Sequence, residues 1–410
     1  MPTLFRGDGR MMVAQSEGWS SPAMLTPWAM MVGDDGRIGW VGAPEDAPRV
    51  GGGLVDLGTS LVTPGLVDSH THPVFAGDRA DEAAARLEGA PYTGGGILRT
   101  VDATRRADDT TLERLVNQRL AAALAAGTTT VECKSGYGLS TTEELRHLRV
   151  LGRVAQWLPV RVVRTLLGAH AVPPEAESIE AHAALVADEM IPAAASEGAA
   201  EFVDVFADRG YFDRRAVERI AHAAAANGLG VRLHADQLAR TGATELGIAL
   251  GAASVDHLEQ LDASGVAALA GSQTVATLLP GPAIVLRDRL PPARALLDAG
   301  ARVALASDGN AGTFGSFGAM PLVIGLGATL LGMTVWEALE AATAGGAAGL
   351  RLENEVGMLR AGLRADFVAW DTEHEGAFAL ALGDVRVRRM WIGGVEVDTG
   401  PSARKMSEHS

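Results

Sequence analysis

Thr63-Pro-Gly-Leu-Val-Asp-Ser-His70-Thr-His72-Pro is the stretch from which the fold of this 410-residue chain can be worked out. Pro64-Gly65 is typical of a turn, and Leu66-Val67 reads as a short buried strand that ends near the two histidines. Histidines two residues apart leave one strand face together, which is how a protein presents two imidazoles to one metal ion. Because an isolated pair could equally lie on the surface, the metal site has to be tested against further ligands.

Short apolar runs like this one recur along the chain and alternate with helical segments. In those segments the apolar residues recur at intervals of three and four, which is typical of amphipathic helices. Eight parallel strands with helices between them, over about 250 residues, predict an α/β fold of the TIM-like (β/α)8 barrel type, whose active site lies at the C-terminal strand ends. A doubly wound sheet competes with this prediction, but no glycine-rich phosphate loop follows the first strand. The runs are residues 66–68, 129–133, 164–168, 202–206, 230–234, 253–257, 273–279 and 302–308, and the helical segments include 112–126, 142–156, 214–226 and 241–250.

The two ends of the chain have a different pattern. Short β-like pieces separated by turn residues occur near the N-terminus and again near the C-terminus, at residues 28–32, 37–41, 365–370 and 386–395. We therefore expect both ends to form one small β-sandwich domain. Its predicted limits are residues 1–62 plus 355–400, beside a catalytic barrel over residues 63–354 and a polar tail over residues 401–410.

Composition and charge argue against several classes of protein. A hydrophobic content of 47% argues against disorder, and a net charge of −15 without a dense basic run argues against nucleic acid or an anionic membrane as partner. Cys133 is the only cysteine, so no intramolecular disulfide can form and a cytoplasmic protein is expected. Residues 309–336 lack charged side chains over a length that could span a bilayer, but repeated glycines and Pro321 favour a buried segment.

Polar side chains finish the predicted strands, where a barrel would bring them together. They are His70, His72, Lys134, His170, Asp204, His234, His257 and Asp308. Three neutral imidazoles and one carboxylate suit zinc and leave room for a water, so we predict a four-ligand site. Its ligands are His70, His72, His234 and Asp308.

Other roles remain open for single residues. Asp308 could instead cap a loop, and His257 could be a packed core imidazole rather than a base or electrostatic partner of the activated water. The remaining histidines lie within helical patterns, the β domain or the tail, and we assign them surface or structural roles. They are His147, His182, His222, His374 and His409.

Nine segments follow one another in order from about residue 61 to residue 313: PGLVDSHTHPVFAGDR, GGGILRTVDATR, TTTVECKSGYGL, TLLGAHAVPPE, VDVFADRGYF, VRLHADQ, SVDHLE, TLLPG and VALASDGNAGT. In these segments the chain resembles the amidohydrolase superfamily, and within it the imidazolonepropionase family. The resemblance implies metal-dependent hydrolysis of a cyclic amide, 4-imidazolone-5-propanoate, to N-formimidoyl-L-glutamate in L-histidine degradation. It also implies one zinc or iron ion per subunit on the four predicted ligands, and a homodimer.

The resemblance also implies substrate contacts, and each has a chemical reason. Arg79 offers a fork of donors for a carboxylate, with a surface ion pair as its alternative role. Tyr137 can cover a flat heterocycle or merely pack, and His170 and Gln237 can hydrogen-bond the ring. The full set is Arg79, Tyr137, His170, Gln237, Asn310, Gly312 and Thr313. As a hypothesis for catalysis, His257 stabilises the oxyanion and Asp308 carries the proton to the departing nitrogen.

Departures from the family pattern leave the metal ligands intact. The usual Asn-Pro-Gly is Asn310-Ala311-Gly312, and the loop around Tyr92 is shorter, which argues against a substrate role for Tyr92. The fourth run lacks the lysine that binuclear relatives carboxylate, while Lys134 ends the second run, so one metal is expected rather than two.

Two other functions are considered. A deaminase of a nucleobase-like ring would place a glutamate three residues after the fifth-strand histidine, but this chain has Gln237, which cannot shuttle a proton. A non-catalytic descendant of the barrel should have lost ligands, and this chain retains the full set. Both comparisons favour a hydrolase that acts on a small molecule and water.

Overall fold

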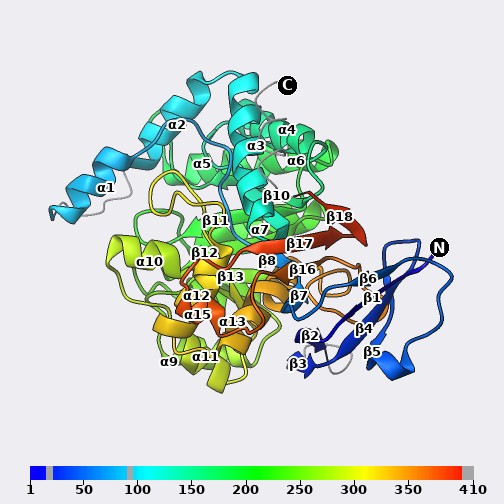
Figure 1. Ribbon diagram of the computed structural model, residues 1–410. Helices are drawn as coiled ribbons and strands as arrows, with labels where there is room; N and C mark the ends of the chain where they lie inside the picture. The colour runs from blue at the N-terminus through cyan, green and yellow to red at the C-terminus, as the bar shows by residue number, and fades with distance from the viewer. Residues whose placement is uncertain (15–21, 90–95, 399–410) are drawn as a thin grey trace.

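A computed structural model of the chain describes residues 1–14, 22–89 and 96–398. The predicted tail over residues 401–410 and Tyr92 therefore lie outside the described residues, as does His409. Figure 1 shows a large helix-covered body with a smaller body of strands at one side, to which the N-terminus belongs.

The large body is built on one sheet of eight strands, each parallel to its neighbours. Each of the eight predicted runs overlaps one strand, and the predicted (β/α)8 barrel is confirmed. In sequence order, which is also the spatial order, the strands are β8 (Leu66–Asp68), β9 (Thr128–Lys134), β10 (Arg161–Ala169), β11 (Phe202–Ala207), β12 (Gly230–Ala235), β13 (Ser254–His257), β14 (Val275–Leu278) and β15 (Val303–Leu305).

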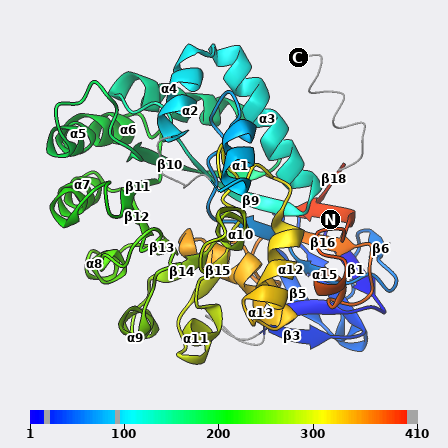
Figure 2. The ribbon, with the colours of Figure 1, turned by 90° about the vertical axis from the view of Figure 1, so that its left-hand side faces the viewer.

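Helices follow the strands and lie around their outside (Figure 2). Six of them begin at a side chain that accepts a hydrogen bond from the backbone N–H three residues later, and these caps are Asp108, Ser140, Ser178, Asp213, Asp262 and Thr334. The helices are α3 (Asp109–Ala125), α4 (Thr141–Val154), α5 (Ile179–Leu185), α6 (Ile191–Ser196), α7 (Arg214–Ala226), α8 (Ala243–Ala249), α9 (Ala263–Ala270), α10 (Pro280–Leu286), α11 (Ala293–Asp298), α12 (Met320–Leu330), α13 (Val335–Glu340) and α14 (Gly346–Gly349).

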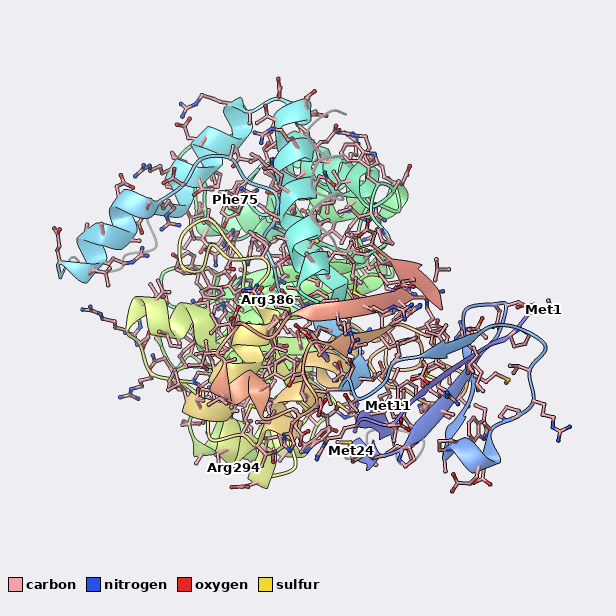
Figure 3. The ribbon with its side chains drawn as sticks, viewed as in Figure 1. Met1, Met11, Met24, Phe75, Arg294 and Arg386 are labelled. Atoms are coloured by element: carbon pink, nitrogen blue, oxygen red, sulfur yellow. The ribbon has the colours of Figure 1, made fainter. Side chains whose placement is uncertain are left out.

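The uncharged stretch over residues 309–336 contains α12. Several side chains of this helix are buried, as expected for this segment. Within the described ranges, none of the helices combines the length and apolar character that crossing a membrane would require. Two further helices, α1 (Ala80–Leu87) and α2 (Gly96–Arg106), extend to one side of the barrel near the loop that carries Phe75 (Figures 1 and 3). Ile97 and Val101 of α2 pack with Phe75 in one apolar cluster.

The chain ends form two sheets beside the barrel, which confirms the separate β structure predicted from both ends. One sheet has the order β5-β4-β1-β6, and the other has the order β18-β17-β16-β7-β2-β3. Their strands are β1 (Thr3–Gly7), β2 (Met11–Ala14), β3 (Pro22–Leu25), β4 (Trp28–Val32), β5 (Ile38–Gly42), β6 (Leu54–Asp56), β7 (Val62–Pro64), β16 (Phe367–Trp370), β17 (Val387–Ile392) and β18 (Val395–Val397). The exact domain limits at residues 62 and 355 remain a prediction.

Aromatic side chains from both ends of the chain share the core between the two sheets. Phe5 of β1 meets Phe367 of β16 edge to face, with ring centroids 5.1 Å apart, and Phe367 stacks on Trp391 of β17 at 4.7 Å. These contacts contribute beyond apolar burial alone, and the Phe5–Phe367 contact joins segments more than 350 residues apart. The β domain therefore needs both chain ends to complete its core.

Side-chain and loop contacts join the two end strands of the barrel sheet, β8 and β15. The Asp68 carboxylate accepts a hydrogen bond from the Ser307 backbone N–H at 2.9 Å and from the Ser307 hydroxyl at 2.6 Å. Beyond them, the Asp308 N–H donates to the His70 carbonyl at 3.0 Å, and the His72 N–H donates to the Gly309 carbonyl at 2.8 Å. Closure of the barrel thus places the His70–His72 segment directly beside Asp308.

Substituting Asp68 by Ala is expected to lower the free energy of unfolding by about 1–3 kcal/mol, because the buried Ser307 amide and hydroxyl lose their acceptor. Denaturant unfolding followed by circular dichroism measures the loss. The exposed Asp384, which pairs with Arg386 at the surface, is the control, and its removal should cost less than about 1 kcal/mol. Equal losses in both variants would contradict this account of closure.

Candidate metal centre

The predicted ligands come together at the C-terminal ends of the barrel strands. His70 and His72 follow β8, His234 lies on β12 and Asp308 follows β15. The His70 and His234 ring centroids are 4.6 Å apart, and those of His72 and His234 are 5.4 Å apart. All four side chains are buried. The barrel therefore gathers into one cluster residues that are far apart in the sequence.

Three donor atoms converge in a way that suits a bound cation. Nε2 of His70 and Nε2 of His72 lie 3.2 Å apart, and Oδ1 of Asp308 lies 3.7 Å from the first and 3.4 Å from the second. Oδ1 of Asp308 is buried and has no hydrogen-bond partner among the residues that the structure describes. A buried carboxylate oxygen without a partner is costly, and a transition metal bound by this oxygen and the two nitrogens would satisfy it. These residues fit the metal that the sequence predicts.

His234 belongs to an adjoining group of donors, formed with His70 and His257, in which one nitrogen from each ring lies within 4.8 Å of the others. His70 is common to both groups. The four predicted ligands thus occupy one continuous cluster, with the His257 imidazole as a further donor at its edge.

Burial and charge keep most of these imidazoles neutral. Burial lowers the pKa of His70 and His72 well below the usual value, and the positive charges that neighbouring groups carry lower it further. Burial also lowers the pKa of His170 to about 3. A neutral imidazole is the form that binds a metal, so at neutral pH these rings are ready to act as ligands.

The pKa of His257 is raised, whereas those of His70 and His72 are lowered. Burial opposes the charged form of His257, but the Glu259 carboxylate, 3.3 Å from Nδ1, together with Asp308 and Asp256 outweighs that effect. Burial raises the pKa of Asp308. The site therefore combines neutral donors with one imidazole that is suited to hold a proton.

Two carboxylates that contact the ligands were not among the site residues predicted from the sequence. Asp256 Oδ2 lies 2.7 Å from His70 Nδ1, and Asp204 Oδ1 lies 3.1 Å from His234 Nδ1. Asp204 was recognisable as a strand end, but Asp256 precedes His257 on one strand, where alternation predicts opposite directions. A left-handed backbone at His257, with φ of 83°, ends that alternation, so both side chains reach His70.

Tyr137 and His170, two of the predicted substrate contacts, lie next to the metal donors. The His170 ring stacks on that of His72 with centroids 5.1 Å apart, and the Tyr137 ring is 5.2 Å from that of His170. Nδ1 of His170 lies 2.9 Å from the Gly136 carbonyl, which leaves Nε2 as its second polar atom. These two rings form one wall of the cluster.

Arg79 and the loop after Asp308 form a second group of predicted contacts. Arg79 donates to the Glu82 carboxylate through Nε at 2.8 Å and Nη2 at 2.6 Å, and a Cβ atom added to Gly312 would fall 2.2 Å from Arg79 Nη1. A side chain at Gly312 would therefore displace the guanidinium from its present position. Asn310 holds the loop: its Oδ1 accepts from the Gly312 and Thr313 amides, and its Nδ2 donates to the Thr313 hydroxyl.

The backbone of Gln237 is held by Asp208, a residue outside the set of site residues predicted from the sequence. The Asp208 carboxylate accepts hydrogen bonds from three consecutive amides, those of Gln237, Leu238 and Ala239, at 2.7–3.1 Å. Gln237 is therefore held in place by the loop after β11. The remaining histidines keep the roles assigned to them: His147 and His182 are buried in helices, whereas His222 and His374 are exposed.

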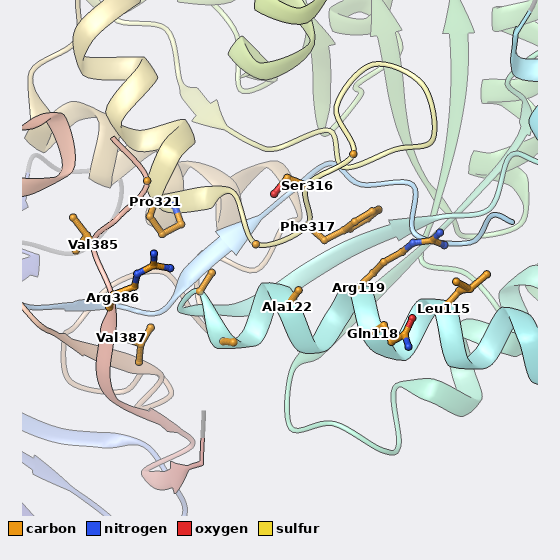
Figure 4. A pocket seen from close by; sticks show the side chains of 15 residues that line it. Leu115, Gln118, Arg119, Ala122, Ser316, Phe317, Pro321, Val385, Arg386 and Val387 are labelled. Atoms are coloured by element: carbon orange, nitrogen blue, oxygen red, sulfur yellow. The ribbon is translucent and has the colours of Figure 1, made fainter. Parts of the chain in front are cut away.

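A cavity of about 530 Å³ lies on the outer side of this region, between α3, the loop over residues 315–318 and residues 383–387 (Figure 4). Its lining contains none of the predicted site residues. Arg119, which borders it, donates to the carbonyls of Pro73 and Phe75 at 2.6 and 2.7 Å. The cavity is thus separate from the metal donors, although Arg119 supports the backbone just beyond His72.

Comparison with known proteins gives consistent results. The model of the amidohydrolase family matches residues 61–397. The imidazolonepropionase of Nocardia farcinica is 43% identical over 396 residues, covering 96% of this chain and 98% of the relative. That of Ectopseudomonas mendocina is 46% identical over 367 residues, covering 87% and 90%.

Solved structures share the fold at low sequence identity. An adenosine deaminase from Xanthomonas campestris with bound zinc has a TM-score of 0.74 at 18% identity, covering 99% of this chain and 97% of its own. N-isopropylammelide isopropylaminohydrolase from Burkholderia multivorans has a TM-score of 0.72 at 22% identity, covering 97% and 98%. At such identity these structures bear on the fold alone.

Substituting Asp308 by Ala is expected to weaken metal binding by at least about 100-fold, because it removes a direct donor. Loss of a residue that only contacts a ligand typically lowers metal affinity by about 10- to 100-fold, and loss of a ligand should lower it further. Elemental analysis of purified protein and titration with zinc measure the change. Asp298→Ala, at an exposed ion pair with Arg294, is the matched control and should bind metal as the parent does. Parental metal content in the Asp308 variant would argue against this ligand.

Proposed function

Because the chain belongs to the amidohydrolase family, we propose that it hydrolyses the cyclic amide of 4-imidazolone-5-propanoate to N-formimidoyl-L-glutamate, a step of L-histidine degradation. The observation that carries this proposal is the identity of 41–46% to proteins named imidazolonepropionase, over most of this chain and most of theirs. The enzyme is a hydrolase of carbon–nitrogen bonds in cyclic amides, and its partners are this small molecule and water.

The predicted contacts match the two ends of that substrate. The Arg79 guanidinium suits the propionate group, which would share the fork of donors now directed at Glu82. Tyr137 and His170 offer flat faces and polar atoms for the imidazolone ring, beside the metal donors. Gln237, and the loop held by Asn310 with Gly312 and Thr313, complete the proposed binding site.

We further propose that His70, His72, His234 and Asp308 hold one zinc or iron ion per subunit. The buried, unpartnered Oδ1 of Asp308 and the neutral imidazoles support this ligand set. A bound metal supplies Lewis acidity, which makes water nucleophilic at neutral pH and polarises a carbonyl. The fourth barrel strand, Phe202–Ala207, contains no lysine, which favours one ion rather than two.

The side chains of this site would then handle the protons and the developing charge. Water adds to the lactam carbonyl carbon, and the Asp308 carboxylate accepts the proton that the water loses. His257, whose pKa is raised by Glu259 against the effect of burial, donates a hydrogen bond to the oxyanion. As the ring carbon–nitrogen bond breaks, Asp308 returns the proton to the departing nitrogen, which gives the open-chain product.

A deaminase or a non-catalytic barrel accounts less well for the same residues. Gln237 stands where a ring-protonating glutamate would be needed, and an amide cannot transfer that proton. A non-catalytic protein would have no use for a buried donor set that is complete.

We also propose a homodimer in the cytoplasm, as the family resemblance and the single buried Cys133 suggest.

The activity can be tested by generating 4-imidazolone-5-propanoate in situ from urocanate with urocanase. Metal-loaded protein should speed the loss of this compound and produce N-formimidoyl-L-glutamate, followed by absorbance and chromatography. Asp308→Ala is the negative control. Failure of the metal-loaded parent to accelerate the step, or release of ammonia from the ring instead, would reject the proposal.

Substituting His257 by Asn is expected to lower kcat by about 10²- to 10⁴-fold, as the loss of an acid–base or charge-stabilising group typically does. Metal content should stay at the parental level, since His257 lies outside the four proposed ligands. His222→Asn, at an exposed helix position, is the matched control and should leave kcat unchanged. Near-normal turnover of the His257 variant with metal retained would contradict its role.

A further inference from the structure

Two fully buried cations, Lys134 and Arg232, lie behind the proposed metal ligands and have no part in the mechanism described above. Lys134 ends β9, and Arg232 lies on β12 two residues before His234, on the same strand face. Lysine and arginine side chains are almost never fully buried unless they are paired, so the contacts of both deserve an explanation.

Each cation holds the carboxylate that contacts Nδ1 of one proposed ligand. Lys134 Nζ lies 2.8 Å from Asp204 Oδ2, and Asp204 Oδ1 lies 3.1 Å from His234 Nδ1. Arg232 Nη2 lies 3.0 Å from Asp256 Oδ2, which in turn lies 2.7 Å from His70 Nδ1. The two arrangements are the same in kind: a buried cation, then a buried carboxylate, then an imidazole.

Both cations also connect to the backbone of the histidine segment. Arg232 Nη2 donates to the Ser69 carbonyl at 2.6 Å, immediately before His70. Lys134 Nζ pairs with Glu132 at 2.8 Å, and Oε2 of Glu132 accepts from the Thr71 N–H at 3.2 Å. The backbone on each side of His70 is thus held by the two cations, by Arg232 directly and by Lys134 through Glu132.

We propose that Lys134 and Arg232 are positioning residues for the metal site, which fix the Asp204 and Asp256 carboxylates so that His234 and His70 direct Nε2 at the metal. A carboxylate can only accept, so the imidazole proton lies on Nδ1 and the lone pair on Nε2. Such outer partners set ring orientation and metal affinity. The arrangement does not extend to His72: within the described ranges its buried Nδ1 has no hydrogen-bond partner, and its ring instead stacks on His170.

This inference rests on the metal site of the proposed function, so its test measures zinc affinity rather than turnover. Zinc alone is titrated into metal-free protein in competition with a chelator. Arg232→Met, and Lys134→Met combined with Glu132→Gln to keep the charge balanced, are expected to bind zinc about 10- to 100-fold more weakly than the parent. Failure of lactam hydrolysis would leave this measurement intact.

Two further variants separate positioning from general stability. Arg232→Lys keeps a cation near Asp256 and should recover much of the affinity that Arg232→Met loses. Arg119→Met removes another cation that supports this segment, through the Pro73 and Phe75 carbonyls, but it touches no carboxylate–imidazole pair. It should lower the thermal midpoint of metal-free protein without changing zinc affinity.

The state of the rings in the parent protein gives a readout that does not depend on changing either cation. Nitrogen NMR of metal-free protein labelled at histidine should show His70 and His234 protonated at Nδ1, with assignments from single His70→Asn and His234→Asn spectra. Protons on Nε2 in the parent would overturn the proposal. Parental zinc affinity in both cation-to-Met variants, with only a lower thermal midpoint, would overturn it as well and identify the ion pairs as purely structural.

Discussion

Closure of the barrel between its first and last strands is the constraint on which the metal cluster depends. Asp68 at the end of β8 holds Ser307 just after β15, and the backbone bonds from Asp308 to His70 and from His72 to Gly309 extend that junction. Residues separated by some 240 positions are thereby fixed at hydrogen-bond distance. Without this junction the His70–His72 segment would lose Asp308 as a neighbour and two of the backbone hydrogen bonds that fix it.

Closure also removes these polar groups from water, and the structure compensates for that burial in two ways. The donors that face the centre of the cluster are neutral imidazoles with lowered pKa values, and they meet an unpartnered carboxylate oxygen that a cation would satisfy. The charged groups one layer behind are matched instead by opposite charges, as with Lys134 between Glu132 and Asp204. A buried charge without such a partner would cost several kcal/mol.

The barrel could be predicted from the sequence because short apolar runs and amphipathic helices are local patterns. The apolar runs are the strands β8 to β15 of the structure, and helices lie between them. The sequence also predicted the cluster because strand ends in a parallel barrel share one rim. It could not predict partners that depend on register between distant strands, such as Asp256 with His70. Nor does local pattern reveal left-handed residues such as His257 and Asp308, or the pairing of β7 with β16, which brings residues 62 and 369 together.

Three carboxylate–imidazole pairs surround the cluster, and their differences bear on which ring binds metal and which holds a proton. The carboxylates beside His70 and His234 each face a buried cation, Arg232 and Lys134 respectively. In the described part of the chain, the carboxylate beside His257 differs: Glu259 is seen to pair with His257 at 3.3 Å and with no lysine or arginine. No buried cation therefore competes with the His257 ring for this carboxylate. The same chemical pair thus serves as a fixed ligand support where a cation completes it, and as a proton-holding pair where none does.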